Sequence, residues 1–264
     1  MRFRTAAPFL CILLLALPLS GCKTARALRG LQGVELVRVE GLYVSPDAVS
    51  ARVLLRWPEH SGTVCVQSLE WEAGAASLSA VPEGPCSSPD RADPPSQWLA
   101  VTASPEALGA LASGKQPGSS LLRAEVDGFA LSLQGQVKPR LRLAEGATAQ
   151  LDGALGMHSA RLEVLGLPPT VRVRIALANP LQVDLETAGA RWEVRVDGRP
   201  LAAGPLDVPE LLRAGEAFEV AVDLDPETAL GIALGGFTGK LTALAELAIQ
   251  TPWGLLQLHS SLDL

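Results

Sequence analysis

Alternation of apolar and polar residues is the feature of this sequence that most constrains its fold. In VRVRIAL, residues 171–177, every second residue is Val, Ile or Leu, and the residues between them are Arg or Ala. Residues 192–197 and 218–225 have the same period of two. Successive side chains of a β-strand point to opposite faces, so each run predicts a strand with one buried face. Asp197 and Gly198 form a pair that favours a hairpin turn.

One segment departs from this period and predicts a short helix. Asp225 is an N-cap candidate, Pro226 suits the first helical position, and Glu227 places a carboxylate near the positive end of the helix dipole. Gly235 and Gly236 end the segment.

The order of these elements repeats at an offset of 121 residues. The offset carries Trp71-Glu72 onto Trp192-Glu193, and Pro105-Glu106 onto Pro226-Glu227. Ser104 then replaces Asp225 as the helix cap. Because rare Trp and Pro residues coincide together with the strand phase, the repeat predicts two copies of one module.

Each copy contains about 110 residues, enough to bury a modest core without a metal. Several short strands separated by turns favour two packed sheets, so we expect an all-β protein of two tandem β-sandwich domains, each with one short helix. The first domain is expected over residues 33–143, as a degenerate copy, and the second over residues 158–264. The small and polar residues 144–157 predict a linker, although a long β arm would have the same composition.

The N-terminal residues resemble the export signal of a bacterial lipoprotein. Arg2 and Arg4 precede an apolar run that is too short to span a membrane. The following Leu19-Ser20-Gly21-Cys22 resembles a lipobox, in which small residues permit cleavage before the Cys and the thiol receives a diacylglycerol. We expect residues 1–21 to be removed, Cys22 to be the lipid attachment site, and residues 22–32 to form a tether. The alternative is an ordinary signal peptide with a chance Cys.

Charge and the expected anchor indicate the partners of the chain. Its 22 Lys and Arg residues are outnumbered by 28 Asp and Glu residues, and it has no basic stripe for phosphates, so nucleic acid is not expected as a partner. The membrane is the expected partner, through the N-terminal lipid. Lys23 after the lipidated Cys favours sorting to the outer membrane, and we expect the protein on its periplasmic face in the cell envelope.

Cysteine usage fits an oxidising compartment. Cys11 leaves with the signal and Cys22 carries the lipid, so Cys65 and Cys86 remain as an even pair. They predict a disulfide. Two unpaired buried thiols are the alternative, because sequence alone does not place the two Cβ atoms.

The run of residues 171–204 resembles the type 2 late embryogenesis abundant family and its Water stress and Hypersensitive response domain. The resemblance is carried by Asn179, Pro180, Leu185, Trp192, Val194, Val196, Gly198 and Leu201 to Gly204. Leu181 departs from it, because members often have a second Asn after the Pro. The first copy fits poorly, with Trp57-Pro58 in place of Asn-Pro. The resemblance implies an Ig-like or fibronectin-like β-sandwich for each of the two domains, tied to desiccation and stress tolerance, with no established enzymatic role.

The Asn179-Pro180 pair interrupts a strand and has a structural interpretation. Proline lacks the N–H that a sheet requires, so it belongs at a strand end, an edge or a bulge. The side chain of Asn179 is then able to bond backbone groups left open by the break. A structural joint accounts for the pair without a ligand; a binding site is the alternative.

Catalytic patterns are not found in the sequence. His60, His158 and His259 lie outside nucleophile and metal-binding motifs, and there is no phosphate-binding glycine loop or paired-Cys zinc spacing. We therefore expect no enzyme activity, no catalytic residue, no metal and no cofactor. The functional hypothesis is a non-catalytic envelope lipoprotein that protects in desiccation or water stress. The alternative is an envelope binding module that holds a protein or lipid partner.

Overall fold

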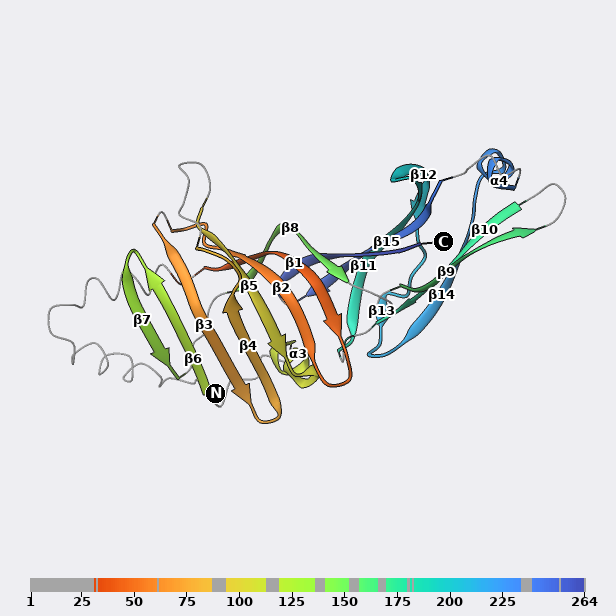
Figure 1. The fold of residues 1–264 in the computed structure, drawn as a ribbon. Coiled ribbons are helices and arrows are strands. Elements are labelled where there is room, and N and C mark those ends of the chain that lie inside the picture. The colour runs from red at the N-terminus through yellow and green to blue at the C-terminus, as the bar shows by residue number, and fades with distance from the viewer. Residues whose placement is uncertain are drawn as a thin grey trace, which may run out of the picture.

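The fold is a computed structural model (Figure 1). It describes residues 31, 33–60, 62–86, 94–112, 119–135, 141–151, 157–165, 170–179, 181, 183–233, 239–251 and 253–263. The regular structure of these residues is nearly all β, with 70 % of residues in strands and 4 % in helices. This agrees with the alternation of the sequence. The expected signal, Cys22 and the expected tether except Leu31 lie outside the described residues, as does Pro180.

Seven strands and one helix make up the first half of the chain. They are β1 (Glu35–Val44), β2 (Val49–Arg56), β3 (Val64–Ala73), β4 (Ala76–Pro82), β5 (Ser96–Ala103), α3 (Pro105–Ala112), β6 (Ser119–Val126) and β7 (Phe129–Gln134). β8 (Arg142–Leu151) follows them. The second half contains β9 (Met157–Leu165), β10 (Thr170–Ala178), β11 (Leu185–Val196), β12 (Arg199–Pro205), β13 (Leu211–Leu212), β14 (Ala217–Asp223), α4 (Pro226–Ala233), β15 (Leu241–Thr251) and β16 (Gly254–Asp263).

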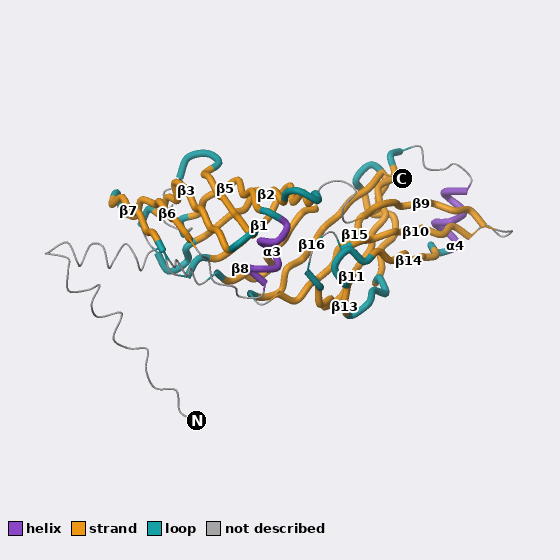
Figure 2. The backbone as a smooth tube through the Cα atoms, turned by 90° about the horizontal axis from the view of Figure 1, so that it is seen from below, coloured by secondary structure: helices purple, strands orange, loops and turns teal. Residues whose placement is uncertain are grey.

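The strands form one large sheet and one small sheet. The large sheet has the order β12-β11-β15-β16-β8-β1-β2-β5-β4-β3-β6-β7, with β13 paired to β11, and the small sheet has the order β14-β10-β9. Figure 2 shows the two halves along the length of the molecule, with β16, β8 and β1 between them. The large sheet is therefore continuous across the two halves.

The order of strand pairing occurs twice. It is β1-β2-β5-β4-β3-β6-β7 in the first half, and β9-β10-β14 followed by β12-β11-β15-β16 in the second. The helices α3 and α4 occupy equivalent positions at the offset of 121 residues. The two orders differ at one place: β5 pairs with β4, whereas β14 and β12 belong to different sheets.

A single bent sheet encloses the core of the first half, where the sequence predicts two packed sheets. One apolar cluster draws side chains from β2 and β5 as well as from β6 and β7, including the buried Leu99 and Leu131. The pairing of β4 with β5 joins what would otherwise be two layers. A second cluster lies under α3, where Ala107 packs with Trp71 and Val49.

A two-layer sandwich encloses the core of the second half. Val171, Val173 and Ile175 of β10 are fully buried and face Trp192 and Val194 of β11. The intervening Arg172 and Arg174 lie on the outer face. Period-two alternation thus separates a dry layer between the sheets from a charged outer layer.

Residues 142–151 form strand β8, which corrects the expectation of a linker at 144–157. β8 runs parallel to both β1 and β16. Ala144, Ala147 and Ala149 are buried in it. Their small side chains fit between packed layers, so a composition typical of a linker here belongs to a sheet interior. Residues 152–156 lie outside the described part of the chain.

A shared apolar cluster also joins the halves. Ala149 and Leu151 of β8 pack with Leu258 of β16, and Leu42 of β1 lies against the same cluster. Leu181 packs against this cluster and against the one under α3. The residue at which the sequence departs from the family pattern therefore contacts the core of both halves.

Candidate functional site

Asn179 lies at the end of β10 and is 2 % exposed. Its side-chain Nδ2 donates to the carbonyl oxygens of Val183 (2.8 Å), Leu212 (3.1 Å) and Arg213 (3.1 Å). Its Oδ1 accepts the N–H of Leu181 at 3.0 Å. Buried polar groups need such partners, and here the protein itself supplies them. The side chain of Asn179 therefore connects the end of β10 to the segment that contains β13, and its role is structural.

At the equivalent strand end of the first half, the joint is formed without a side-chain amide. Trp57, which occupies this place in the first copy, is 2 % exposed and belongs to the main apolar cluster. Its backbone N–H donates to the carbonyl oxygen of Pro95 at 2.9 Å. At this position the first half therefore has a buried indole that packs in the core, where the second half has the hydrogen-bonded side chain of Asn179.

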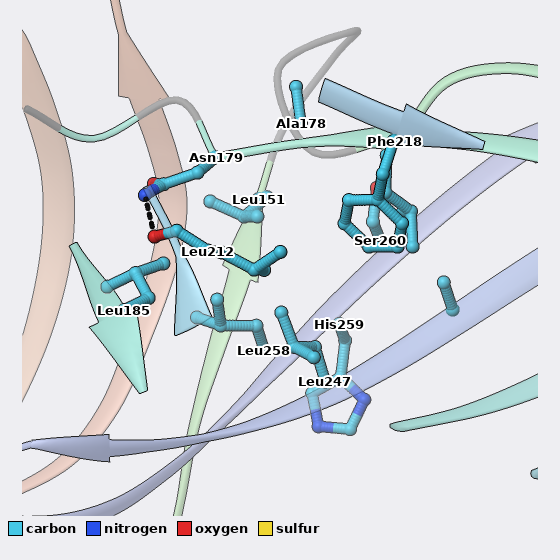
Figure 3. A pocket seen from close by; sticks show the side chains of 12 residues that line it. Leu151, Ala178, Asn179, Leu185, Leu212, Phe218, Leu247, Leu258, His259 and Ser260 are labelled. Carbon is cyan, nitrogen blue, oxygen red and sulfur yellow. Dashed lines mark hydrogen bonds between the residues drawn. The ribbon is translucent and has the colours of Figure 1, made fainter. Parts of the chain in front are cut away.

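An apolar pocket adjoins Asn179 inside the sandwich (Figure 3). Its lining is Leu151, Leu177, Ala178, Asn179, Leu185, Leu212, Phe218, Ala245, Leu247, Leu258, His259 and Ser260. The cavity has a volume of about 30 Å³, enough for about one or two water molecules. Ser260 is buried in the lining, and its Oγ has no hydrogen-bond partner among the described residues. The pocket is a small packing gap lined mostly by apolar side chains.

The remaining residues of the family pattern hold the hairpin between β11 and β12. Trp192 is buried in the sandwich core, and a Cβ on Gly204 would lie 3.0 Å from its Nε1. Asp197 and Gly198 both have positive φ, at 49° and 77°. These are the conformations that an Asp-Gly turn of this type requires. Trp192, Gly198 and Gly204 of the pattern therefore serve the geometry of the hairpin.

Asp197 also ties the hairpin to the start of β15. Its Oδ1 accepts the N–H of Lys240 at 2.9 Å, while its own N–H donates to the Lys240 carbonyl at 3.0 Å. Asp127 makes the same pair of bonds with Thr63, both at 2.9 Å, in the first half. Sequence reasoning did not single out Asp127, although the Asp127-Gly128 pair carries the same turn signal as Asp197-Gly198.

Cys65 and Cys86 are joined by a disulfide, with their Cα atoms 5.4 Å apart. The bond attaches β3 to the segment that follows β4. Gln97 of β5 lies beside it, with its Nε2 3.6 Å from the Cys86 sulfur. Gln97 is buried and also exchanges two hydrogen bonds with the backbone of Val66. The bridge and the glutamine together stabilise one end of the first core.

The histidines do not gather into a centre. His60 Nε2 lies 3.4 Å from Asp127 in the first half, and His259 Nδ1 lies 3.5 Å from Glu246 in the second. The side chain of His158 lies outside what the structure describes. Within the described ranges no three His, Cys, Asp or Glu side chains are grouped so as to hold a metal ion.

Ion pairs cover the outer face of the small sheet. Arg172 makes two hydrogen bonds to Asp223, at 2.6 and 2.9 Å, and this contact holds the pKa of the Asp223 carboxyl below its ordinary value. Arg174 joins Glu163 of β9 to Glu219 of β14, at 2.9 and 2.8 Å. Hydrogen bonds to Glu219 and Glu163 raise the pKa of Arg174. The face is charged and solvated, and its charges are matched across the strands.

No helix in the described part of the chain is long and apolar enough to cross a membrane.

Comparisons with known proteins add little to this geometry. No family model matches the chain, and no curated protein matches it. Solved structures that align with it include a red sea bream transglutaminase, with a TM-score of 0.32 and 10 % identity over 93 % of this chain and 32 % of that chain. A protein from Archaeoglobus fulgidus aligns with a TM-score of 0.24 and 12 % identity over 41 % of this chain and 98 % of that one. The chain thus spans 32 % of the transglutaminase. These TM-scores are too low to support an argument about the fold. The description of the architecture therefore depends only on the strand pairing and the apolar clusters of this chain.

Proposed function

We propose that this chain is a non-catalytic lipoprotein of the cell envelope, with two tandem β domains that protect against desiccation or water stress. The lipid on Cys22 anchors it, and the second domain is of the type 2 late embryogenesis abundant kind. The observation that carries the proposal is the joint at Asn179, where the Asn of the family pattern is buried and bonded to three backbone carbonyls.

The surface chemistry supports the same proposal. The outer face of the small sheet exposes ion pairs between Arg172 and Asp223 and between Arg174 and Glu219. The chain has a formal net charge of −6. Charged surfaces of this kind hold water and keep folded domains apart when protein concentration rises during drying. Tethered at a membrane, such domains shield neighbouring proteins from one another.

A survival experiment tests the function. A strain that lacks the protein should survive drying less well than its parent, with equal growth in rich medium. Reintroducing the wild-type chain should restore survival, and Cys22→Ser should not, because it releases the chain from the membrane. Equal survival of the deletion strain and its parent after drying and after osmotic shock would reject the protective function.

The anchor has its own test. Mass spectrometry of the membrane fraction should find lipidated Cys22 as the N-terminal residue. An unmodified N-terminus at any other position would reject the lipid anchor while leaving the survival result to be judged separately.

The second candidate function is an envelope binding module. Two exposed apolar side chains favour it, Trp253 at 36 % and Leu255 at 44 % exposure, both at the hairpin between β15 and β16. The hairpin is held in place, since Trp253 accepts the N–H of Leu143 through its carbonyl at 3.0 Å. Exposed apolar groups on a rigid support suit contact with a protein or lipid partner.

Substitution at this hairpin separates the two functions. For a binding module, Trp253→Ala combined with Leu255→Ser should abolish co-purification with envelope components and leave thermal stability within a few degrees of wild type. For a protective protein, the same variant should restore full survival to the deletion strain. A matched control is Gln257→Ser, which changes an exposed polar residue of the same strand.

A further inference from the structure

Within the described part of the chain, the strand β14 is paired on one side only. Its partner is β10, and it ends the three-stranded sheet at the margin of the molecule (Figure 1). Leu224 N–H donates to Val171 at 2.8 Å, and Asn179 N–H donates to Glu216 at 2.9 Å, so even-numbered residues of β14 bond to β10. Bonding alternates along an antiparallel strand. The backbone N–H and C=O groups of Glu219, Ala221 and Asp223 therefore point away from the sheet.

The equivalent strand in the first half is covered at this edge. β5 pairs with β4 through five residue pairs, from Leu78↔Ala103 to Pro82↔Leu99. Glu83 N–H donates to Trp98 at 2.9 Å and Ser104 N–H donates to Ser77 at 2.8 Å, which sets the alternation. Trp98, Ala100 and Thr102 thus bond to β4. At the offset of 121 residues these are Glu219, Ala221 and Asp223.

Burial of the core side chains follows the difference in pairing. Leu99 of β5 is 1 % exposed under β4. Its equivalent Val220 is only half-buried, as are its neighbours Phe218 and Val222 on the same face. A strand added beside β14 would cover this row, as β4 covers the row of β5. Among the described residues nothing covers it.

The charges beside the edge define the chemistry of a suitable strand. Along one row of the small sheet, Glu163, Arg172 and Asp223 lie opposite one another on successive strands, so the sign of the charge alternates. The row ends on the half-exposed carboxylate of Asp223, and Glu219 lies further along the same edge. Opposite charges on directly facing residues stabilise a strand pair. A basic side chain on the added strand would extend the row.

We propose that the free edge of β14 binds an extended polypeptide segment in antiparallel pairing. The segment bonds to the backbone of Glu219, Ala221 and Asp223. It carries apolar side chains toward Val220 and Val222, and alternates these with Lys or Arg beside the two carboxylates. This is strand addition at a sheet edge, in which main-chain bonds give affinity and alternate side chains give selectivity. The surface goes beyond the protective function and does not depend on it.

A peptide with the sequence of residues 170–178, TVRVRIALA, is a suitable probe, because this sequence already pairs with β14 in β10 and places Arg opposite Asp223. Amide hydrogen exchange is measured by NMR on the mature chain with Cys22→Ser, with and without about 1 mM peptide. The amides of Glu219, Ala221 and Asp223 should become at least about tenfold more protected. Those of Phe218, Val220 and Val222 should not change.

Two matched controls test the pairing and the charge. Ala221→Pro removes an N–H that no described strand of this sheet uses, and proline is accepted at such an edge position. It should abolish protection by the peptide, whereas Ala221→Ser should retain it. A peptide with Glu in place of both Arg residues, TVEVEIALA, should protect at least about tenfold less. If Ala221→Pro fails to fold, the exchange measurements on the wild-type chain decide the matter.

Four results would overturn the proposal. The first is that TVRVRIALA gives no protection, and the second is that TVEVEIALA protects equally well. The third is that the amides of Glu219, Ala221 and Asp223 are already protected in the dilute chain without peptide. The fourth is that their protection grows with protein concentration in the absence of peptide. The third would show that another segment of this chain covers the edge. The fourth would show that a second copy does.

Discussion

The side-chain nitrogen of Asn179 lies 3.1 Å from the carbonyl oxygen of Leu212 and ties the end of β10 to β13. Leu212 is itself 2 % exposed and part of the apolar cluster shared by the two halves. A polar residue thus stabilises an apolar interior, because its amide bonds backbone carbonyl groups at the edge of the cluster.

Replacement of this amide tests the joint. Asn179→Ala should lower the free energy of unfolding by about 1–3 kcal/mol, because the carbonyls of Val183 and Leu212 lose a donor. The Arg213 carbonyl keeps the N–H of Glu216 as a donor. Urea unfolding with an unchanged m-value measures it. Asn179→Asp keeps the acceptor for Leu181 and removes the donors, so it should be at least as destabilising at pH 7. A stable Asn179→Ala variant that had lost a partner or protection in drying would instead make Asn179 a site.

Gly204 is a second position where geometry sets the residue type. A Cβ there would lie 3.0 Å from Nε1 and 3.3 Å from Cε2 of Trp192. Because Trp192 is packed in the sandwich core, it has little room to move. Gly204→Ala should therefore destabilise the chain by about 1–2 kcal/mol, measured by thermal unfolding.

Gly198 provides the contrast to Gly204. A Cβ added at Gly198 would meet no atom within 4 Å, but the backbone there has a φ of 77°. Gly198→Asn should cost less than Gly198→Ala, since Asn tolerates the left-handed conformation. At position 204 the larger Asn should destabilise the chain more than Ala does. If Gly204→Asn cost less than Gly204→Ala, the cause at position 204 would not be steric.

Local patterns in the sequence were enough to predict several of these elements. Alternation predicts β10 and β14, because a half-buried strand must change face at every residue. The helix start at Asp225 is also predictable, and its Oδ1 accepts the N–H groups of Glu227 (3.1 Å) and Thr228 (3.0 Å). The helix start after Ser104 agrees with the structure as well, because α3 begins at Pro105. The Ser104 hydroxyl accepts the N–H of Ser77 and donates to the Ala75 carbonyl of the neighbouring hairpin.

Contacts between distant segments were beyond local patterns. Small residues in β8 have the composition of a linker, and only the packing of Ala147 and Ala149 between strands reveals a sheet interior. Leu181 is visible in the sequence as a departure from the family pattern, but its contacts with both halves depend on how the halves meet. Likewise, the free edge of β14 becomes apparent only when its pairing is compared with that of β5.

The continuous sheet changes what is expected when the halves are separated. A protease site placed within residues 152–156 should yield two pieces that remain associated, because β8 pairs with β1 on one side and β16 on the other. Size-exclusion chromatography after cleavage measures this, with the uncleaved chain as control. Two pieces that separate freely and each melt cooperatively would instead establish independent domains joined by a linker.

Leu181 tests the apolar part of the same junction. Leu181→Asn introduces the residue that is common here in the family that the sequence resembles, and removes a side chain that packs on two clusters. It should lower stability by about 1–3 kcal/mol, in proportion to the apolar area exposed. After cleavage within 152–156, the variant pieces should dissociate at a lower urea concentration than the wild-type pieces. Val183→Thr, at a half-buried position in the same segment, is the control for a general loss of packing there.

Acid should weaken the start of α4 through Asp225. Hydrogen bonds with the side chain and then the backbone of Thr228 hold the pKa of Asp225 below its ordinary value of 3.8. A carboxyl with a lowered pKa in the folded state contributes stability that is present above the unfolded pKa and is lost as the pH falls through the folded one. Asp225→Asn keeps a capping oxygen but does not titrate, so it should lose less thermal stability than wild type between pH 7 and pH 3.

Asp225→Ala, which lacks the cap at every pH, should be less stable than Asp225→Asn at pH 7. Equal losses on acidification for wild type and Asp225→Asn would show that other carboxyls, such as Asp223 beside Arg172, account for the acid sensitivity.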